Sequence, residues 1–292
     1  MRRPSTAQLF AAAVAIWGTT WLAITFQLGR VAPEASVAWR FGLASAAAAG
    51  ICRARGLPLR FPARVHGNLA LMGLFMFCLG YLAVYHAETM LVSGLVAVGY
   101  SASPLVNVVT ARVGLGVRPG RATVAGGLLG MCGVALVFWP EIARMEAGSG
   151  ARAGAALTAA GVLASAVGNV FATRLEHLGV GVWQKMAWGM AYGAAGCALA
   201  AVLSGGSLAP EWTPTYLGSL VYLAAFGSIG AFSAFLTLLE RVGPARAGYV
   251  GVMTPIVALS LSMLLEGFAW RPLTVAGIAA AVAGQAVMLR AR

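Results

Sequence analysis

The chain has 292 residues, of which 60% are hydrophobic and 10% are charged, with a formal net charge of +12. Soluble domains are about one-quarter charged, so this composition excludes an ordinary soluble protein and predicts an all-α membrane protein surrounded by a lipid bilayer. We expect no nucleic-acid partner, because the Lys and Arg residues lie in short groups between apolar segments and form no single basic patch.

The first apolar segment follows Arg2 and Arg3, an arrangement that signal peptides also have. Because the segment continues to about Leu28, we expect a retained first helix. A helix needs about 20 mostly apolar residues to cross a bilayer, and ten segments of the chain approach that length. In chain order they are 7–28, 34–54, 67–89, 91–112, 121–139, 151–174, 181–203, 214–238, 244–265 and 272–290.

The two halves of the chain share a sequence repeat with a spacing of 151 residues. The recurring residues are Thr-Val-Ala-Gly at 123–126 and 274–277, Pro104 and Pro255, and Gly133 and Gly284. Each half holds five segments, an odd number, so the second half must enter the membrane from the opposite side. The sequence therefore predicts ten transmembrane helices in two inverted five-helix repeats, residues 1–147 and 148–292. Transporters of this architecture bind substrate between the repeats.

The distribution of Lys and Arg predicts the orientation. Fifteen of the 20 lie at segment ends on one side, four lie on the other side, and Arg40 lies inside the second segment. Positive charge is retained on the cytoplasmic side of a membrane, so both termini are predicted to be cytoplasmic. We expect a multi-pass protein of a bacterial inner membrane.

Several short motifs match a known family. They are Trp17-Gly18 in the first segment, Arg40-Phe41 in the second, a central proline in the fourth and ninth, and Glu266 followed by Thr274-xx-Gly277. With ten helices in two inverted halves, the chain resembles the drug/metabolite transporter superfamily. Within it the chain is most similar to EamA-type exporters, and among these to the bacterial exporters of aromatic amino acids. The resemblance implies alternating access, a central cavity between the repeats, and neither a cofactor nor an ATP-binding module.

Aromatic and polar side chains inside the segments are candidates for the lining of that cavity. Several aromatic residues are spaced four apart and so share a helical face. Such stripes often only pack, but facing a cavity they would suit a planar hydrophobic solute or a lipophilic cation. The predicted cavity residues are Trp17, Trp21, Tyr81, Tyr85, His86, Tyr100, Asn169, Trp188 and Tyr249.

Ionisable groups within the membrane are functional candidates, because their burial is costly. Arg40 is expected either to extend to the outer interface or to pair with Glu88 and fasten an outer gate. Lys185 lies near the inner end of the seventh segment, where inversion would place the counterpart of Arg40. It is either a second gating residue or an ordinary interfacial anchor.

Pro104 and Pro255 lie near the middle of the fourth and ninth segments, and each deprives a carbonyl of its usual amide partner. The matched bends are either a hinge for alternating access or a static curvature that shapes the cavity.

The coupling groups of an ion-driven pump are scarce. The chain has no Asp, and no Glu lies near the middle of a segment, so facilitated export is the expected mode. His86 could carry a proton, because the pKa of an unperturbed histidine lies nearest physiological pH, or it could simply accept or donate a hydrogen bond.

The sequence thus predicts a secondary transporter that exports small amphipathic metabolites, foremost aromatic or other hydrophobic amino acids. The alternatives are an exporter of lipophilic cations or drugs, a channel, and an intramembrane enzyme. Small drug pumps of the superfamily use a Glu in the first helix, which is absent here. An enzyme is not expected, because no nucleophile and base, paired acids or metal cluster can be assembled from the pattern. No catalytic residue and no metal site is predicted, and the oligomeric state is left open.

Overall fold

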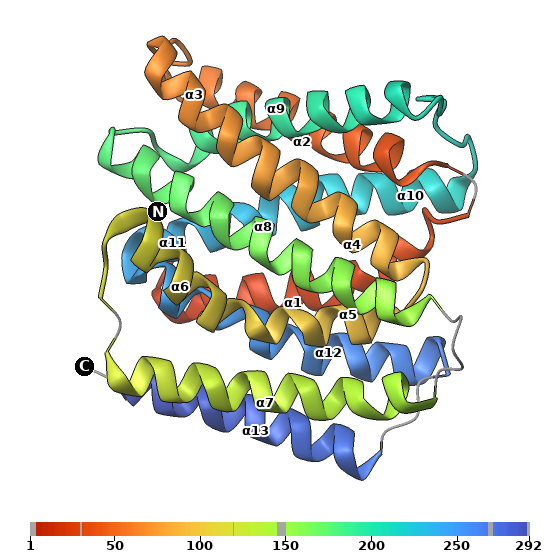
Figure 1. Cartoon of the computed structure of the whole chain (residues 1–292). Helices are drawn as coiled ribbons and strands as arrows, with labels where there is room; N and C mark the ends of the chain where they lie inside the picture. Colours follow the sequence, from red (N-terminus) through yellow and green to blue (C-terminus); the bar gives the residue numbers. More distant parts are fainter. Residues whose placement is uncertain (1–3, 30, 119, 145–149, 268–270, 291–292) are drawn as a thin grey trace.

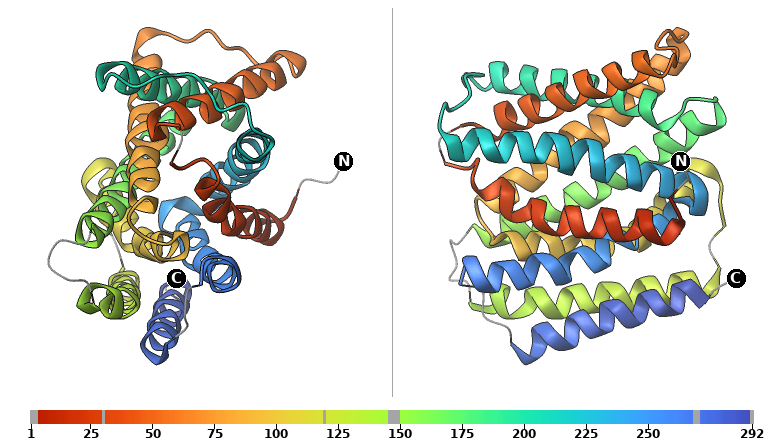
Figure 2. Two further views of the ribbon diagram at one scale, coloured as in Figure 1. Left: turned by 90° about the vertical axis from the view of Figure 1, so that its right-hand side faces the viewer. Right: turned by 180° about the vertical axis from the view of Figure 1, so that it is seen from behind.

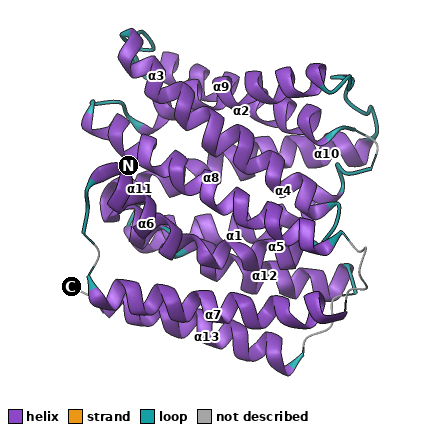
Figure 3. Cartoon of the chain, in the orientation of Figure 1, coloured by secondary structure: helices purple, strands orange, loops and turns teal. Residues whose placement is uncertain are grey.

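The computed structural model describes residues 4–29, 31–118, 120–144, 150–267 and 271–290 (Figure 1). Within these residues every regular element is a helix and none is a strand (Figure 3), which confirms the predicted all-α class. The elements are α1 (Thr6–Thr25), α2 (Pro33–Ala54), α3 (Ala63–Met72), η1 (Gly73–Leu79), α4 (Gly80–Glu88), α5 (Ser93–Gly99), η2 (Tyr100–Ala102), α6 (Ser103–Leu115), α7 (Arg121–Arg144), α8 (Ala151–His177), α9 (Val182–Leu203), α10 (Pro214–Tyr222), η3 (Leu223–Gly230), α11 (Ala231–Ala247), α12 (Val250–Leu265) and α13 (Pro272–Arg290).

Seven helices or continuous helical runs are long and apolar enough to cross a membrane. They are Thr6–Thr25, Pro33–Ala54, Ala63–Glu88, Ser93–Leu115, Ala151–His177, Val182–Leu203 and Pro214–Pro244. Three further apolar helices are shorter over the described residues: Arg121–Val137, Val250–Leu265 and Pro272–Gly284. Each predicted segment coincides with a helix. Gly243 has a φ of 78°, which breaks the helix directly before Pro244, the predicted start of the ninth segment; helical structure resumes there and runs to Ala247, and α12 follows from Val250.

The helices run roughly parallel to one another and form a bundle with two flanking pairs (Figures 1 and 2). α2 packs against α9 on one flank, and α7 packs against α13 on the other. Between the flanks lie α1, α4, α8, α11 and α12. Both chain ends lie at one end of the bundle, which we name the terminal end; the opposite end is the far end (Figure 1).

The α7–α13 pair depends on close backbone contact between glycines. A Cβ added to Gly133 would meet the carbonyl oxygen of Gly277, and one added to Gly284 would meet that of Gly126. Gly133 and Gly284 are counterparts in the 151-residue spacing, as are Gly126 and Gly277. The contact is therefore the same on both helices, as it is at a two-fold interface. Small residues allow such close approach in membranes.

Two membrane-length helices contain a π-helical segment with i→i+5 hydrogen bonding. These segments are η1, between α3 and α4, and η3, between α10 and α11. Segments of this kind are rare and are frequent at functional sites, because the wider turn re-aims side chains. In η3 the hydroxyl of Ser228 donates to the carbonyl of Leu223 at 3.0 Å, five residues earlier. This bond fixes Ser228 Oγ on the inner face of the bundle, where it accepts a hydrogen bond from Arg40.

Candidate functional site

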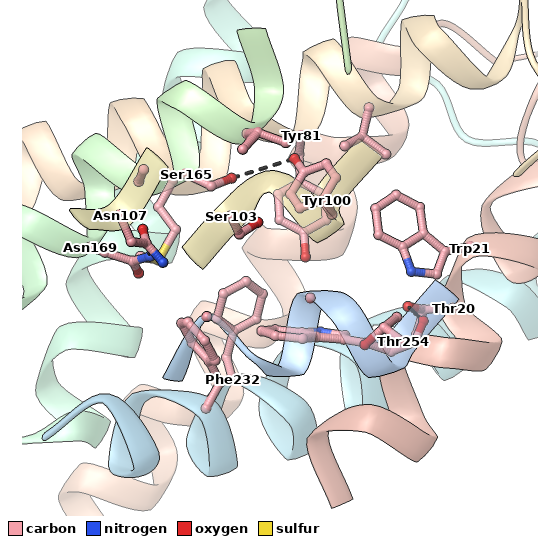
Figure 4. A pocket seen from close by; sticks show the side chains of 18 of the residues that line it. Thr20, Trp21, Tyr81, Tyr100, Ser103, Asn107, Ser165, Asn169, Phe232 and Thr254 are labelled. Carbon is pink, nitrogen blue, oxygen red and sulfur yellow. Dashed lines mark hydrogen bonds between the residues drawn. The ribbon is translucent and has the colours of Figure 1, made fainter. Parts of the chain in front are cut away.

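A pocket lies between helices of the N-terminal and C-terminal halves of the chain (Figure 4). The space between its atoms amounts to about 820 Å³, including its open part. α1, α2, η1, α4, η2 and α6 line it from the first half, and α8, α11 and α12 from the second. Five of the predicted cavity residues line it: Trp17, Trp21, Tyr81, Tyr100 and Asn169.

The pocket wall is largely aromatic. The ring of Trp17 packs edge-on against Phe232, with ring centroids 4.9 Å apart, and its Nε1 donates to the carbonyl of Gly227 at 3.1 Å. Trp21 lies against Tyr100, with centroids 5.1 Å apart. These contacts hold the rings rigidly, so they present flat apolar surfaces with few rotamers to be frozen on binding.

Three lining residues carry polar atoms that have no hydrogen-bond partner among the described residues. Asn169 donates from Nδ2 to Asn107 Oδ1 at 3.1 Å, but its own Oδ1 is unpartnered. Trp21 Nε1 and both terminal nitrogens of Arg40 are also unpartnered. Buried polar atoms are nearly always hydrogen-bonded in proteins, so these donors and this acceptor are suited to a bound solute.

Arg40 is the charged group of the pocket. Its side chain is 0% exposed and lies among the lining residues, so it does not extend to an interface. Its Nε donates to Ser228 Oγ at 3.0 Å, and the predicted pair with Glu88 is absent from this structure. The reason is the position of η3, which places Ser228 beside α2. Glu88 is itself buried, and neither of its carboxylate oxygens has a hydrogen-bond partner among the described residues.

The structure places the other four predicted cavity residues away from this pocket. Tyr85 is fully buried and donates to Gln27 Oε1 at 2.8 Å. His86 Nε2 lies 2.7 Å from Glu34 Oε1 at the far end. At the terminal end Trp188 donates to the carbonyl of Leu59 at 2.9 Å. Tyr249 is buried against Val108. The side chains of these four residues are engaged within the bundle itself.

Comparison with known proteins identifies the family. The sequence model of the EamA-like transporter family matches residues 5–139 and 152–290. The chain belongs to the EamA-like transporter family. The transporter is 31% identical over 272 residues to YedA of Escherichia coli strain K12, an uncharacterized inner membrane transporter, with 90% of this chain and 83% of YedA aligned. Protein PagO of Salmonella typhimurium strain LT2 is 22% identical, with coverage of 92% and 88%.

A protein of known crystal structure shares the fold of this transporter. The two superpose with a TM-score of 0.75 over 100% of this chain and 99% of the other, at 23% sequence identity. The matches to the family model and to YedA confirm the resemblance to EamA-type proteins of the drug/metabolite superfamily, and the transporter is a multi-pass membrane protein.

The transporter has a buried ion pair at the terminal end, where the sequence suggested either an anchor or a gate. Lys185 is 0% exposed, and its Nζ lies 2.5 Å from Glu240 Oε1 and 3.4 Å from the carbonyl oxygen of Ala172. The pair thus ties α9 to α11 and α8. Full burial makes Lys185 more than an interfacial anchor. Its position is 151 residues after Glu34, whose partner is His86 at the far end.

The two matched prolines of the transporter adopt different local structures. Pro104 lies at the start of α6, just after the 3₁₀ turn η2, whereas Pro255 lies inside α12. Thr254 donates to the carbonyl of Val250 at 2.6 Å, as hydroxyls do next to a proline in membrane helices. The carbonyl of Gly251, which Pro255 deprives of its amide, accepts a bond from Ser101 Oγ at 3.5 Å. The segment before Pro104 in the first half therefore contacts the segment before Pro255 in the second half.

Sequence reasoning missed several lining residues of the transporter. They are Thr20, Asn107, Ser165, Phe232 and Phe235, among others. Phenylalanine, threonine and serine are common on packed membrane helices, so no local pattern singled these out. Among the described residues there is no group of three His, Cys, Asp or Glu that could hold a metal ion.

Proposed function

We propose that this protein is a secondary transporter in which two inverted five-helix repeats, residues 1–147 and 148–292, expose a central pocket alternately to the two sides of the membrane. All ten apolar helices would then cross the bilayer. Three matched features support the inverted repeat. η1 and η3 occupy the third membrane helix of each half. The α7–α13 glycine contact is the same on both helices. The Glu34–His86 and Lys185–Glu240 pairs join the second and third helices of each half at opposite ends.

We also propose that the terminal end faces the cytoplasm of a bacterial cell and that the protein lies in the inner membrane. The α2–α3 and α6–α7 connections lie at the terminal end, and arginines lie in both of them and in the adjoining helix ends. Positive charge is retained on the cytoplasmic side, which supports this orientation. YedA, the relative described as an inner membrane transporter, supports the location.

The proposed substrates are small amphipathic metabolites, foremost aromatic or other hydrophobic amino acids, which the protein exports. The observation that carries this proposal is the composition of the pocket. Aromatic rings form its wall, while single unpartnered polar atoms of Trp21, Arg40 and Asn169 project from different helices. Sites for small organic molecules combine an apolar wall with a few placed polar groups in this way.

An exporter of lipophilic cations is the second candidate, because aromatic faces attract cations. The buried guanidinium of Arg40 in the same pocket would repel such a ligand, since like charges in a desolvated site interact strongly. The amino-acid proposal is therefore the stronger of the two.

Uptake into proteoliposomes tests the proposal. We expect saturable uptake of labelled phenylalanine and tryptophan, accelerated when unlabelled substrate is loaded on the opposite side, and little uptake of a quaternary ammonium dye. Uptake of the dye alone would contradict the amino-acid substrates. Flux that does not saturate and shows no countertransport would indicate a channel.

Trp21→Phe tests whether the pocket is the transport site. The Nε1 of Trp21 has no partner among the described residues, so the substitution removes a donor without breaking an internal bond. We expect KM for phenylalanine to rise about threefold to tenfold, the value of one hydrogen bond. Trp188→Phe is the matched control, because it removes an indole donor that bonds Leu59 outside the pocket. Equal effects of the two variants on KM would count against this pocket.

A further inference from the structure

Arg40 is a buried cation whose hydrogen-bonding capacity is mostly unused. Its side chain is 0% exposed, and Nη1 and Nη2 have no hydrogen-bond partner among the described residues. A guanidinium carries five N–H donors, and the Nε–H of Arg40 alone is engaged, with Ser228. Four donors of this group are thus left over in the wall of the central pocket.

The protein holds this guanidinium in one position. Ser228 Oγ accepts from Nε at 3.0 Å and is itself fixed by its bond to Leu223 in η3. The guanidinium carbon lies 4.7 Å from the centroid of the Tyr81 ring, within the range of a cation–π contact. A Cβ at Gly227 would lie 3.0 Å from Nη2, so the glycine leaves room for the group. The donors are therefore positioned in advance of any ligand.

None of the acids near the far end is hydrogen-bonded to Arg40. Glu34 contacts His86, and Glu266 accepts hydrogen bonds from Ser93 and Ser262. Glu88 forms no hydrogen bond with Arg40. A buried guanidinium whose donors have no acceptor is costly, and a planar carboxylate matches its fork with two parallel hydrogen bonds. The missing acceptor is thus expected from the solute in the pocket.

We propose that Arg40 binds the carboxylate of the transported solute, so that the substrates are carboxylic acids with an aromatic or apolar body. This assignment rests on the proposed function and narrows it: the acid group is required, whereas the amino group is not. The indole N–H of Trp21 is a second unpartnered donor in the same pocket. Lipophilic cations and amines without an acid group would leave the N–H donors of Arg40 and of Trp21 without an acceptor.

Binding to the purified full chain, with four probes, tests this assignment. The probes are phenylalanine, 3-phenylpropionate, phenethylamine and tetraphenylphosphonium. We expect the first two to bind and phenethylamine to bind about 10-fold to 100-fold more weakly, the range for hydrogen bonds to a charged group. Arg40→Gln should weaken binding of the two acids by a similar factor and should not weaken binding of the phenethylammonium cation, which the guanidinium repels, and Arg40→Lys should restore part of the loss for the acids. Arg174→Gln is the matched control, because Arg174 lies on α8 and donates to the carbonyl of Gly114 at the terminal end.

Thermal unfolding without ligand separates a binding role from a structural one. Arg40→Gln removes a buried charge whose terminal nitrogens have no hydrogen-bond partner among the described residues, so its Tm should equal or exceed that of the wild type. Equal affinities for phenylpropionate and phenethylamine in both the wild type and Arg40→Gln would overturn the assignment. It would also be overturned if Glu88→Gln lowered the preference for phenylpropionate over phenethylamine as much as Arg40→Gln does. Failure of the proposed function would be seen separately, as absence of aromatic uptake by wild-type proteoliposomes.

Discussion

Glu240→Gln is expected to destabilise the folded protein by about 3 kcal/mol, because it removes the counter-charge of a fully buried lysine. The side chain of Lys185 is 0% exposed, against 25% for Glu240, so the lysine cannot reach water when its partner is lost. The pair also joins three helices at the terminal end through the carbonyl of Ala172. Unfolding of the detergent-solubilised protein, followed by circular dichroism, measures the change.

Glu34→Gln is the matched control for this prediction. Its partner His86 has a side chain that is 40% exposed, so the pair at the far end can be replaced by water. Exposed pairs contribute up to about 1 kcal/mol, and the loss should stay within that limit. The double variant Lys185→Met with Glu240→Leu should recover most of the loss, since an apolar pair of similar volume needs no counter-charge. Equal losses for Glu240→Gln and Glu34→Gln would contradict the account of the buried pair.

Gly133→Ala is expected to cost about 2 kcal/mol through overpacking of the α7–α13 contact. The added Cβ would meet the carbonyl of Gly277 and lie 2.6 Å from the nitrogen of Ala281, so the two helices would have to move apart. Gly284→Ala should cost the same amount, because its Cβ would meet the equivalent carbonyl of Gly126. The measurement is again the free energy of unfolding.

Gly130→Ala on the same helix is the control for the glycine contact. A Cβ at Gly130 would have nothing within 4 Å, so the substitution should be neutral or slightly stabilising through helix propensity. The difference between the variants at 133 and 130 isolates the contact, because the propensity gain is common to both. If Gly284→Ala were harmless while Gly133→Ala was costly, the two-fold character of this interface would be contradicted.

Much of the fold could be predicted from the sequence, because membrane helices are specified by length and apolarity. The π-helical segments could not, since their hydrogen bonding depends on neighbouring helices. The π-helical segment η3 is the reason that Ser228 reaches Arg40.

The site was predictable in part. Trp17 and Trp21 share a helical face that turns to the pocket, as the four-residue spacing indicated. Tyr85 has the same spacing from Tyr81, yet it donates to Gln27 and does not line the pocket, so a four-residue spacing alone does not bring both rings to one cavity. The rotation of a helix about its long axis depends on tertiary packing, so the sequence alone could not predict that Arg40 faces the pocket. Likewise, 55 residues separate Lys185 from Glu240, and no local pattern joins them.

Alternating access requires that one pocket open in turn to each side of the membrane. Its most direct test is the labelling of Ser165→Cys, a small change at a pocket-lining position, in a chain whose exposed Cys132 is replaced by alanine. An impermeant maleimide is applied to right-side-out and to inside-out vesicles. We predict modification from each side, slowed in both cases by saturating phenylalanine. Labelling from one side only, or labelling that phenylalanine does not slow from either side, would contradict the account.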